Sequence, residues 1–111
     1  MNLKIDKLGE IVIAEIPAEH LDASNCEELE QALTELIGKE DQIILDMRNV
    51  GFIDSSGVGV LLFCIRTVDE KEGKICICNP TETVSMAFEL VRIHRLCSVT
   101  NSRDEALRRF N

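Results

Sequence analysis

Runs of apolar residues separated by short polar segments divide this chain into alternating strands and helices. The run over residues 43–47 is bracketed by polar residues, which indicates a buried strand. A longer apolar run begins at Val58 and exceeds the length of one strand, so it predicts a helix that is buried on most sides. The polar turn Asp54-Ser55-Ser56-Gly57 lies between them, and the helix is expected from about Ser56 to Glu70. The predicted core positions of this region are Val58, Leu61, Leu62 and Ile65 on the helix, with Ile44 and Ile75 on neighbouring strands.

The N-terminal part of the chain predicts a β-hairpin followed by a helix. Residues 3–5 alternate between apolar and polar, and the β-branched run over residues 11–16 ends before Pro17. A loop from Pro17 to Ala23 then leads to Ser24, which has the spacing of a capping box. The apolar stripe of the following helix consists of Cys26, Leu29, Leu33, Leu36 and Ile37, and Gly38 is its expected C-cap.

Two further helices and two further strands are predicted in the C-terminal part. A strand is expected over residues 74–78, and Asn79 is expected to cap a helix that begins at Pro80. A short strand near residues 97–100 precedes a small helix capped by Ser102. The predicted core stripe of the helix after Asn79 is Val84, Ala87, Phe88 and Val91. Three apolar residues lie off that stripe, and they either widen the buried face, which is the favoured interpretation, or form an exposed contact patch: Met86, Leu90 and Ile93.

The alternation of strands and helices predicts the fold class. Strands joined through helices form right-handed parallel crossovers, whereas the N-terminal hairpin adds an antiparallel strand. We therefore expect an α/β fold with a mixed sheet of four or five strands, opened by a β-hairpin, and about four helices packed on it. The length of 111 residues predicts that residues 1–111 form one domain.

Charge narrows the classes of partner. The formal net charge is -8 and the isoelectric point is near 4.7, which disfavours nucleic acid and anionic lipid and favours a partner with a basic surface. No apolar run reaches the roughly 18 residues of a membrane span, and the N-terminus lacks the apolar region of a signal peptide. We therefore expect a cytoplasmic protein that does not insert into membranes.

The five cysteines predict neither a metal site nor a disulfide framework. Cys76 and Cys78 are two residues apart in a predicted strand, so both side chains should point to the same face. No second pair and no histidine cluster completes a zinc site. We expect reduced cysteines that are mostly buried and behave as small apolar residues.

The candidate chemistry lies in the turn before the central helix, and it does not match an enzyme. A nucleophile elbow needs glycine two residues before the serine, but Ile53 and Asp54 occupy those positions. The two histidines, His20 and His94, lie in no context that marks a general base. No phosphate-binding P-loop is present. The sequence therefore predicts a protein that is not an enzyme and holds no cofactor and no metal.

The same turn fits a serine that is itself modified. A hydroxyl at a helix N-terminus is accessible, and a phosphate there meets free backbone N–H groups and a favourable helix dipole. That phosphate would add about -1.5 to -2 charges beside Asp54. The alternative is that Asp54, Ser55 and Ser56 only cap the helix, and the spacing alone does not decide between the two interpretations.

A resemblance to a known family favours the modified serine. The features that carry it are the apolar strand ending in Asp46, the pair Phe52-Ile53, the turn Asp54-Ser55-Ser56-Gly57, and Gly59 in an apolar helix. Together they resemble the signature of the STAS domain, specifically of bacterial anti-sigma factor antagonists. The similarity extends over nearly the whole chain, since Glu19 and Asp22 resemble a Gly-Glu-apolar-Asp element and residues 88–90 resemble a Phe-Asp-apolar element.

The resemblance implies a phosphorylation switch. By it Ser55 is the phospho-acceptor, Ser56 is its neighbour and helix cap, and Asp54 positions or polarises the acceptor. The site residues are then Ser55 for phosphorylation, Asp54, Ser56 and Gly57 in support, and Glu19, Asp22, Asp54 and Ser55 in partner binding. The unphosphorylated protein would bind a kinase-type anti-sigma factor, the phosphorylated protein would not, and a phosphatase would reset the cycle. We expect a monomer or weak dimer.

Other functions stay open at this point. STAS domains also serve in transporters, lipid-transport machinery and sensory complexes, so the chain is alternatively a docking subunit that is never modified. A weaker alternative is a small enzyme that uses Ser55 or Ser56. For the leading hypothesis we expect a partner surface with an apolar centre and a charged rim. It should include Glu19, Asp22, the Asp54-Ser55 turn and the exposed side of the helix that starts at Ser56.

Overall fold

The computed structural model describes all residues from Met1 to Asn111. The strands and helices follow one another in an order close to the predicted one. Their bounds are β1 (Lys4–Leu8), β2 (Ile11–Glu15), β3 (His20–Leu21), α1 (Cys26–Lys39), β4 (Gln42–Asp46), β5 (Phe52–Ile53), α2 (Ser55–Glu70), β6 (Lys74–Cys78), α3 (Glu82–Val91), the 3-10 helix η1 (Ile93–Arg95), β7 (Ser98–Thr100) and α4 (Arg103–Arg108).

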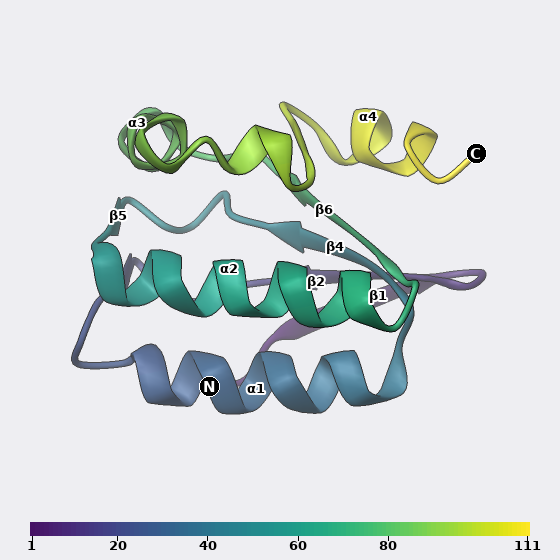
Figure 1. Cartoon of the computed structure of the whole chain (residues 1–111), viewed down its shortest axis with the longest axis horizontal. Coiled ribbons are helices and arrows are strands. Elements are labelled where there is room, and N and C mark those ends of the chain that lie inside the picture. The colour runs from purple at the N-terminus through teal and green to yellow at the C-terminus, as the bar shows by residue number, and fades with distance from the viewer.

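A five-stranded mixed sheet forms the centre of the molecule, with the strand order β1-β2-β4-β6-β7. The hairpin strand β1 is antiparallel to β2, and β2, β4, β6 and β7 are parallel. Helices α1 and α2 lie side by side on one face of the sheet (Figure 1), α3 and η1 contribute buried residues to the same large core, and α4 packs on the opposite face. The predicted fold, a mixed sheet opened by a hairpin with four α-helices, is confirmed.

The sheet separates a large apolar core from a small one. The large core is filled mainly by α1, α2 and the strand residues that face them, such as Ile43 and Ile75. The small core lies between the sheet and α4, and it consists of Ile13, Ile44, Cys76, Cys78 and Ala106. Ile44 and Ile75 are therefore both buried on adjacent strands, as predicted, but they face opposite sides of the sheet.

The burial of the central helix agrees with the prediction except at one residue. Val58, Leu61 and Ile65 are buried. Leu62 was expected in the core and is only partly buried, so that prediction is wrong. Its side chain packs against the core from the border of the buried face of α2.

Several helix ends differ from the predicted ones by one or two residues, and at α2 and α3 the reason is that another side chain caps the helix. Asp54, not Ser56, caps α2. Asn25 precedes α1, whose last residue, Lys39, lies beyond the predicted end at Gly38. Helix α3 begins at Glu82 and is capped by Thr81, because Asn79 adopts a left-handed conformation with φ 55°. The predicted cap at Ser102 is confirmed, since its Oγ accepts a hydrogen bond from Glu105 N at 3.1 Å.

The apolar residues that lie off the core stripe of α3 divide into two groups. Ile93 is buried, whereas Met86 is 62% exposed and Leu90 is 86% exposed. Val91, which was expected in the core, is also exposed. The favoured interpretation, a wide buried face, is therefore confirmed only for Ile93 and is wrong for Met86 and Leu90, which are exposed.

The predicted loop between β2 and α1 contains an additional short strand. The two residues of β3 pair in parallel with the two residues of β5, His20 opposite Phe52 and Leu21 opposite Ile53. This small second sheet holds the loop against the start of α2. No helix of the chain is long and apolar enough to cross a membrane.

Candidate functional site

The candidate site is built on the first turn of α2, which Asp54 caps. Asp54 has an extended backbone, with φ -108° and ψ -174°. Its Oδ1 accepts hydrogen bonds from Ser56 N at 2.9 Å and from Gly57 N at 3.2 Å. The carboxylate thereby satisfies two of the N–H groups that a helix leaves without partners, at the positive end of the helix dipole.

Ser55 is the first residue of α2, and its side chain is free. The residue is exposed, and its hydroxyl makes no hydrogen bond within the chain. Ser56 is partly buried and its side chain is not the helix cap, since Asp54 fills that role. Of the two neighbouring hydroxyls, that of Ser55 is therefore the more accessible to another protein.

Gly57 supports the site through close packing. The residue is buried, and a Cβ atom added there would lie 2.8 Å from the Leu21 carbonyl oxygen and 2.8 Å from Ile53 Cγ1. Any larger side chain would push the first turn of α2 away from β3 and β5. The absence of a side chain at Gly57 thus fixes where Ser55 lies relative to the β3 loop.

The β3–β5 pairing brings Asp22 to the same place. Asp54 N donates a hydrogen bond to the Leu21 carbonyl at 3.0 Å, so Asp22 follows β3 beside the start of α2. Asp22 Oδ1 accepts hydrogen bonds from the hydroxyl and the backbone N–H of Ser24, the latter at 2.9 Å. These two bonds hold the pKa of the Asp22 carboxyl below its usual range, so a fixed negative charge lies close to Asp54.

Glu19 lies at the other end of β3. Its backbone carbonyl accepts a hydrogen bond from Gly51 N at 2.8 Å, while its exposed side chain forms no ion pair or hydrogen bond. The length of β3 separates Glu19 from Asp22. The structure therefore groups Asp22, Asp54 and Ser55 closely and places Glu19 at the margin.

Apolar side chains are exposed on both sides of Ser55. Phe52 on β5 is 49% exposed, and Phe63, two turns further along α2, is 46% exposed. Helix α3, which presents Met86 and Leu90, packs against β5. The surface around Ser55 thus combines acidic groups with exposed apolar ones.

Asp46 lies at the centre of a buried ionic cluster whose members the sequence did not predict. Asp46 is fully buried at the end of β4 and accepts hydrogen bonds from Arg103 Nε at 2.7 Å, Arg48 Nε at 3.0 Å and Asn79 Nδ2 at 3.2 Å. Desolvation raises the pKa of the Asp46 carboxyl, but these hydrogen bonds outweigh it and hold the pKa below its usual range. Arg103 also bonds Glu15 at 3.0 Å. The only signal in the sequence was an acidic residue at the end of an apolar strand.

The remaining titratable groups do not form a second reactive site. All five cysteines are free, and burial raises the pKa of Cys64, Cys78 and Cys97 to about 12, so these thiols stay protonated. No group of histidine, cysteine and acidic side chains has the arrangement of a metal site. The start of α2 is therefore the candidate functional site of this chain.

Comparisons with known proteins agree with the fold. The STAS domain family matches residues 2–106. A curated relative, the candidate anti-sigma factor antagonist BtrV of Bordetella bronchiseptica, is 28% identical over 111 residues, which cover 99% of this chain and 95% of BtrV.

Solved structures share the same fold. The anti-sigma factor antagonist SpoIIAA in its unphosphorylated form has a TM-score of 0.78 and 22% identity, covering 98% of this chain and 96% of that one. SpoIIAA of Bacillus in the phosphorylated form has a TM-score of 0.73 and 23% identity, covering 99% and 100%. The murine anion transporter Slc26a9 contains a similar region, with a TM-score of 0.77, 19% identity and coverage of 92% of this chain and 18% of the transporter.

Proposed function

Since this chain belongs to the STAS domain family, among the anti-sigma factor antagonists, we propose that phosphorylation of Ser55 switches its binding to an anti-sigma factor. The antagonists of this family are regulatory proteins rather than enzymes. The unphosphorylated chain binds a kinase-type anti-sigma factor in the cytoplasm and so frees a sigma factor for transcription. Phosphorylation of Ser55 by that kinase ends the binding, and a phosphatase restores it.

The observation that carries this proposal is the free, exposed hydroxyl of Ser55 at the N-terminus of α2. A kinase must reach the acceptor oxygen without unfolding the substrate, and no intramolecular hydrogen bond has to break at Ser55. A phosphate at this position is close to the positive end of the helix dipole, so the fold tolerates it. SpoIIAA, whose fold is similar, exists in a phosphorylated form, which supports the same kind of modification here.

The effect of the phosphate on binding is electrostatic. Asp54 and the ionised Asp22 already place two negative charges near Ser55. A phosphate adds about -1.5 to -2 more. Like charges brought together in an interface cost several kcal/mol, which is enough to change affinity by about a hundredfold or more. The partner surface is therefore proposed to include Glu19, Asp22, Asp54 and Ser55.

Phosphate mapping tests the acceptor. The purified chain is incubated with ATP and each kinase-type anti-sigma factor of the same cell, and the modified residue is identified by mass spectrometry. We expect phosphate on Ser55, no incorporation in Ser55→Ala, and continued incorporation in the matched control Ser56→Ala. Phosphate on Ser56 or Thr67 instead would show that the acceptor is assigned wrongly.

Affinity measurements test the switch. Even in the presence of ATP, Ser55→Ala should bind the anti-sigma factor as tightly as the unphosphorylated wild type does. Ser55→Asp and the phosphorylated wild type should bind at least about a hundredfold more weakly. Calorimetric titration measures all three. Equal affinities for the phosphorylated and unphosphorylated chains would leave only a docking function.

That docking function is the second candidate. The region of similar fold in the transporter Slc26a9 shows that this fold also occurs within larger membrane proteins. As a docking subunit the chain would bind a transporter, lipid-transport or sensory assembly without modification at Ser55. It predicts no kinase activity toward Ser55 and no loss of binding in Ser55→Asp.

A further inference from the structure

Gly59 has no role inside the protein. It lies in the second turn of α2, where glycine destabilises a helix relative to alanine because it loses more backbone freedom on folding. The residue is exposed, and a Cβ atom added there would meet no atom within 4 Å. Gly57 by contrast is required by its contacts with Leu21 and Ile53. A glycine that intramolecular packing does not need leaves the helix backbone open to a molecule outside.

The bare backbone at Gly59 lies between two exposed side chains. Ser55 precedes it by four residues and Phe63 follows it by four, so the three share one side of α2. Phe63 is 46% exposed, although burying a phenylalanine side chain is strongly favourable. The exposed side of α2 thus offers a hydroxyl, an uncovered backbone and an aromatic ring in sequence.

Phe63 also forms one wall of an open groove between α1 and α2. The groove has a volume of about 650 Å³. Its other lining residues all come from one side of α1 and are polar or acidic, and they are Glu27, Glu30, Gln31, Thr34 and Glu35. From Glu27 to Glu35 the helix rises about 12 Å, which is the length of two helical turns.

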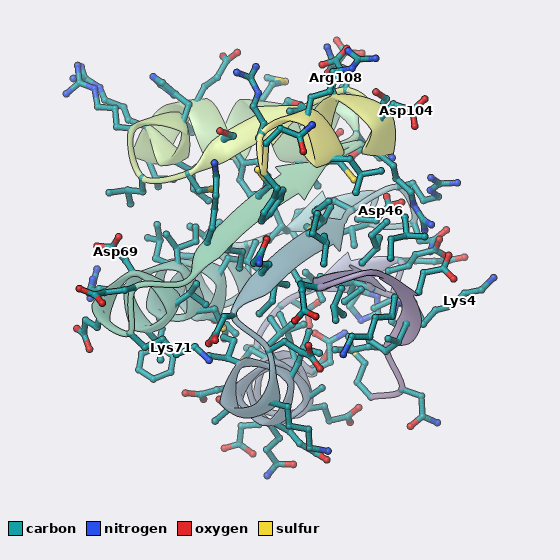
Figure 2. All side chains as sticks on the ribbon, turned by 90° about the vertical axis from the view of Figure 1, so that its right-hand side faces the viewer. Lys4, Asp46, Asp69, Lys71, Asp104 and Arg108 are labelled. Carbon is teal, nitrogen blue, oxygen red and sulfur yellow. The ribbon has the colours of Figure 1, made fainter.

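The charge of the groove specifies its occupant. Glu35 is paired with Lys39 at 3.5 Å, but Glu27 and Glu30 have no partner in the chain. Residues 92–111 contain five of the seven arginines against Asp104 and Glu105, while Arg66 is exposed on α2, three residues after Phe63. Asp104 and Arg108 lie on α4, on the opposite side of the sheet from Asp69 and Lys71 at the end of α2 (Figure 2). A basic segment is therefore attracted to the side of α1 that presents Glu27 and Glu30, and not to the α4 side.

We propose that the α1–α2 groove binds a basic amphipathic helix of the anti-sigma factor, as a second contact that does not depend on the phosphate. An apolar residue of that helix packs on Phe63, its lysine or arginine side chains face Glu27 and Glu30, and its closest approach to α2 is over Gly59. This inference rests on the proposed function, because the partner is the same protein. It adds a second site on that partner's footprint, outside the group of acidic residues around Ser55.

Two glycine variants test the close approach. Gly59→Ala should lower the affinity for the unmodified anti-sigma factor at least tenfold, while its denaturation midpoint stays equal to or above that of the wild type. Gly38→Ala is the matched control, because Gly38 is also an exposed helical glycine with no atom within 4 Å of an added Cβ. It should show a similar midpoint and an affinity within twofold of the wild type.

Two further comparisons test the contact with the Phe63 ring and the attraction to the negative charge of α1. Phe63→Ala should lower affinity at least tenfold in both the wild-type and Ser55→Ala backgrounds. Glu30→Gln should slow association several-fold, whereas Asp104→Asn, which removes one exposed negative charge from α4, should not.

The outcomes separate this inference from the proposed function. If Gly59→Ala and Phe63→Ala bind like the wild type while Ser55→Asp does not, the groove contact is wrong and the switch stands. If the wild type binds no anti-sigma factor, both are wrong. If sedimentation detects a dimer of the wild type that Phe63→Ala abolishes, the groove binds a second copy of this chain, which overturns the proposed occupant.

Discussion

At the scale of single residues, the ion pairs of Asp46 decide how α4 is held. The carboxylate lies at the end of β4 and is fully buried, so its charge depends on hydrogen bonds rather than on water. Arg103 at the start of α4 bonds both Asp46 and Glu15, which joins the helix to two strands. Figure 2 shows Asp46 near the centre of the molecule, between α4 and the helices on the opposite side. This cluster stabilises the fold and takes no part in the proposed switch.

Asp46→Asn should destabilise the protein by about 2 to 4 kcal/mol, because it leaves two arginines beside a buried neutral group. Denaturant unfolding measures the change. The matched control is Asp69→Asn on the exposed side of α2, which should alter stability by no more than about 0.5 kcal/mol. A loss below about 1 kcal/mol in Asp46→Asn would mean that the cluster does not hold α4.

The difference in unfolding free energy between the wild type and Asp46→Asn should depend on pH, because the pKa of Asp46 is lowered in the folded protein. A carboxyl with a folded-state pKa below its ordinary value of 3.8 contributes stability above that value and loses it as the pH falls through the folded-state pKa. The gap between wild type and Asp46→Asn should therefore be constant from neutral pH to about pH 4 and shrink below it. If the stability difference between the wild type and Asp46→Asn already shrinks between pH 7 and pH 5, a titratable group other than Asp46 causes the pH dependence.

At the scale of elements, α2 has one face in the core and one face in solvent. Leu61 is fully buried between the sheet and α1, while Leu62 is only partly buried at the edge of that contact. Ser55, Gly59 and Phe63 lie on the exposed face. The same helix therefore supplies the centre of the core and the centre of the proposed partner surface.

Truncating these two leucines should have unequal effects. Leu61→Ala should cost about 2 to 5 kcal/mol, because it removes buried methyl groups and leaves a cavity. Leu62→Ala should cost less than half as much, since its side chain is partly solvated already. Denaturant midpoints at constant m-value measure both. Equal losses would show that the buried face of α2 is wider than the structure indicates.

At the scale of the whole molecule, the net charge of -8 is unevenly distributed. Helix α1 has four glutamates and one lysine, and the acidic groups at Asp22 and Asp54 lie next to its start. Residues 92–109, which follow α3 and contain η1 and α4, include five arginines: Arg92, Arg95, Arg103, Arg108 and Arg109. A basic partner is therefore steered to the side that presents Ser55.

Association with the anti-sigma factor should slow as salt is added. Raising the ionic strength from about 0.01 M to 0.1 M shortens the Debye length from about 30 Å to about 10 Å. The association rate should fall roughly tenfold over that range while the dissociation rate changes little. Stopped-flow mixing at several salt concentrations measures the two rates. An association rate that is independent of salt would contradict electrostatic steering.

The sequence by itself determined the strands of the five-stranded sheet, the hairpin and the place of Ser55 at the start of a helix. These depend on local patterns: alternation in residues 3–5, the apolar runs before and after the turn, and the caps of helices. Asp54 and Ser55 are adjacent in the chain, so the position of the hydroxyl at a helix N-terminus follows from the sequence alone.

The tertiary structure decided what depends on residues far apart in the sequence. The pairing of β3 with β5 brings Asp22 beside Asp54, and two-residue strands leave no periodic pattern to recognise. Asp46 and Arg103 are 57 residues apart, so nothing local links them. The sequence did not decide that Leu62 is only partly buried and that Leu90 is exposed, because a helical pattern shows which side of a helix is apolar but not how much of that side its neighbours cover.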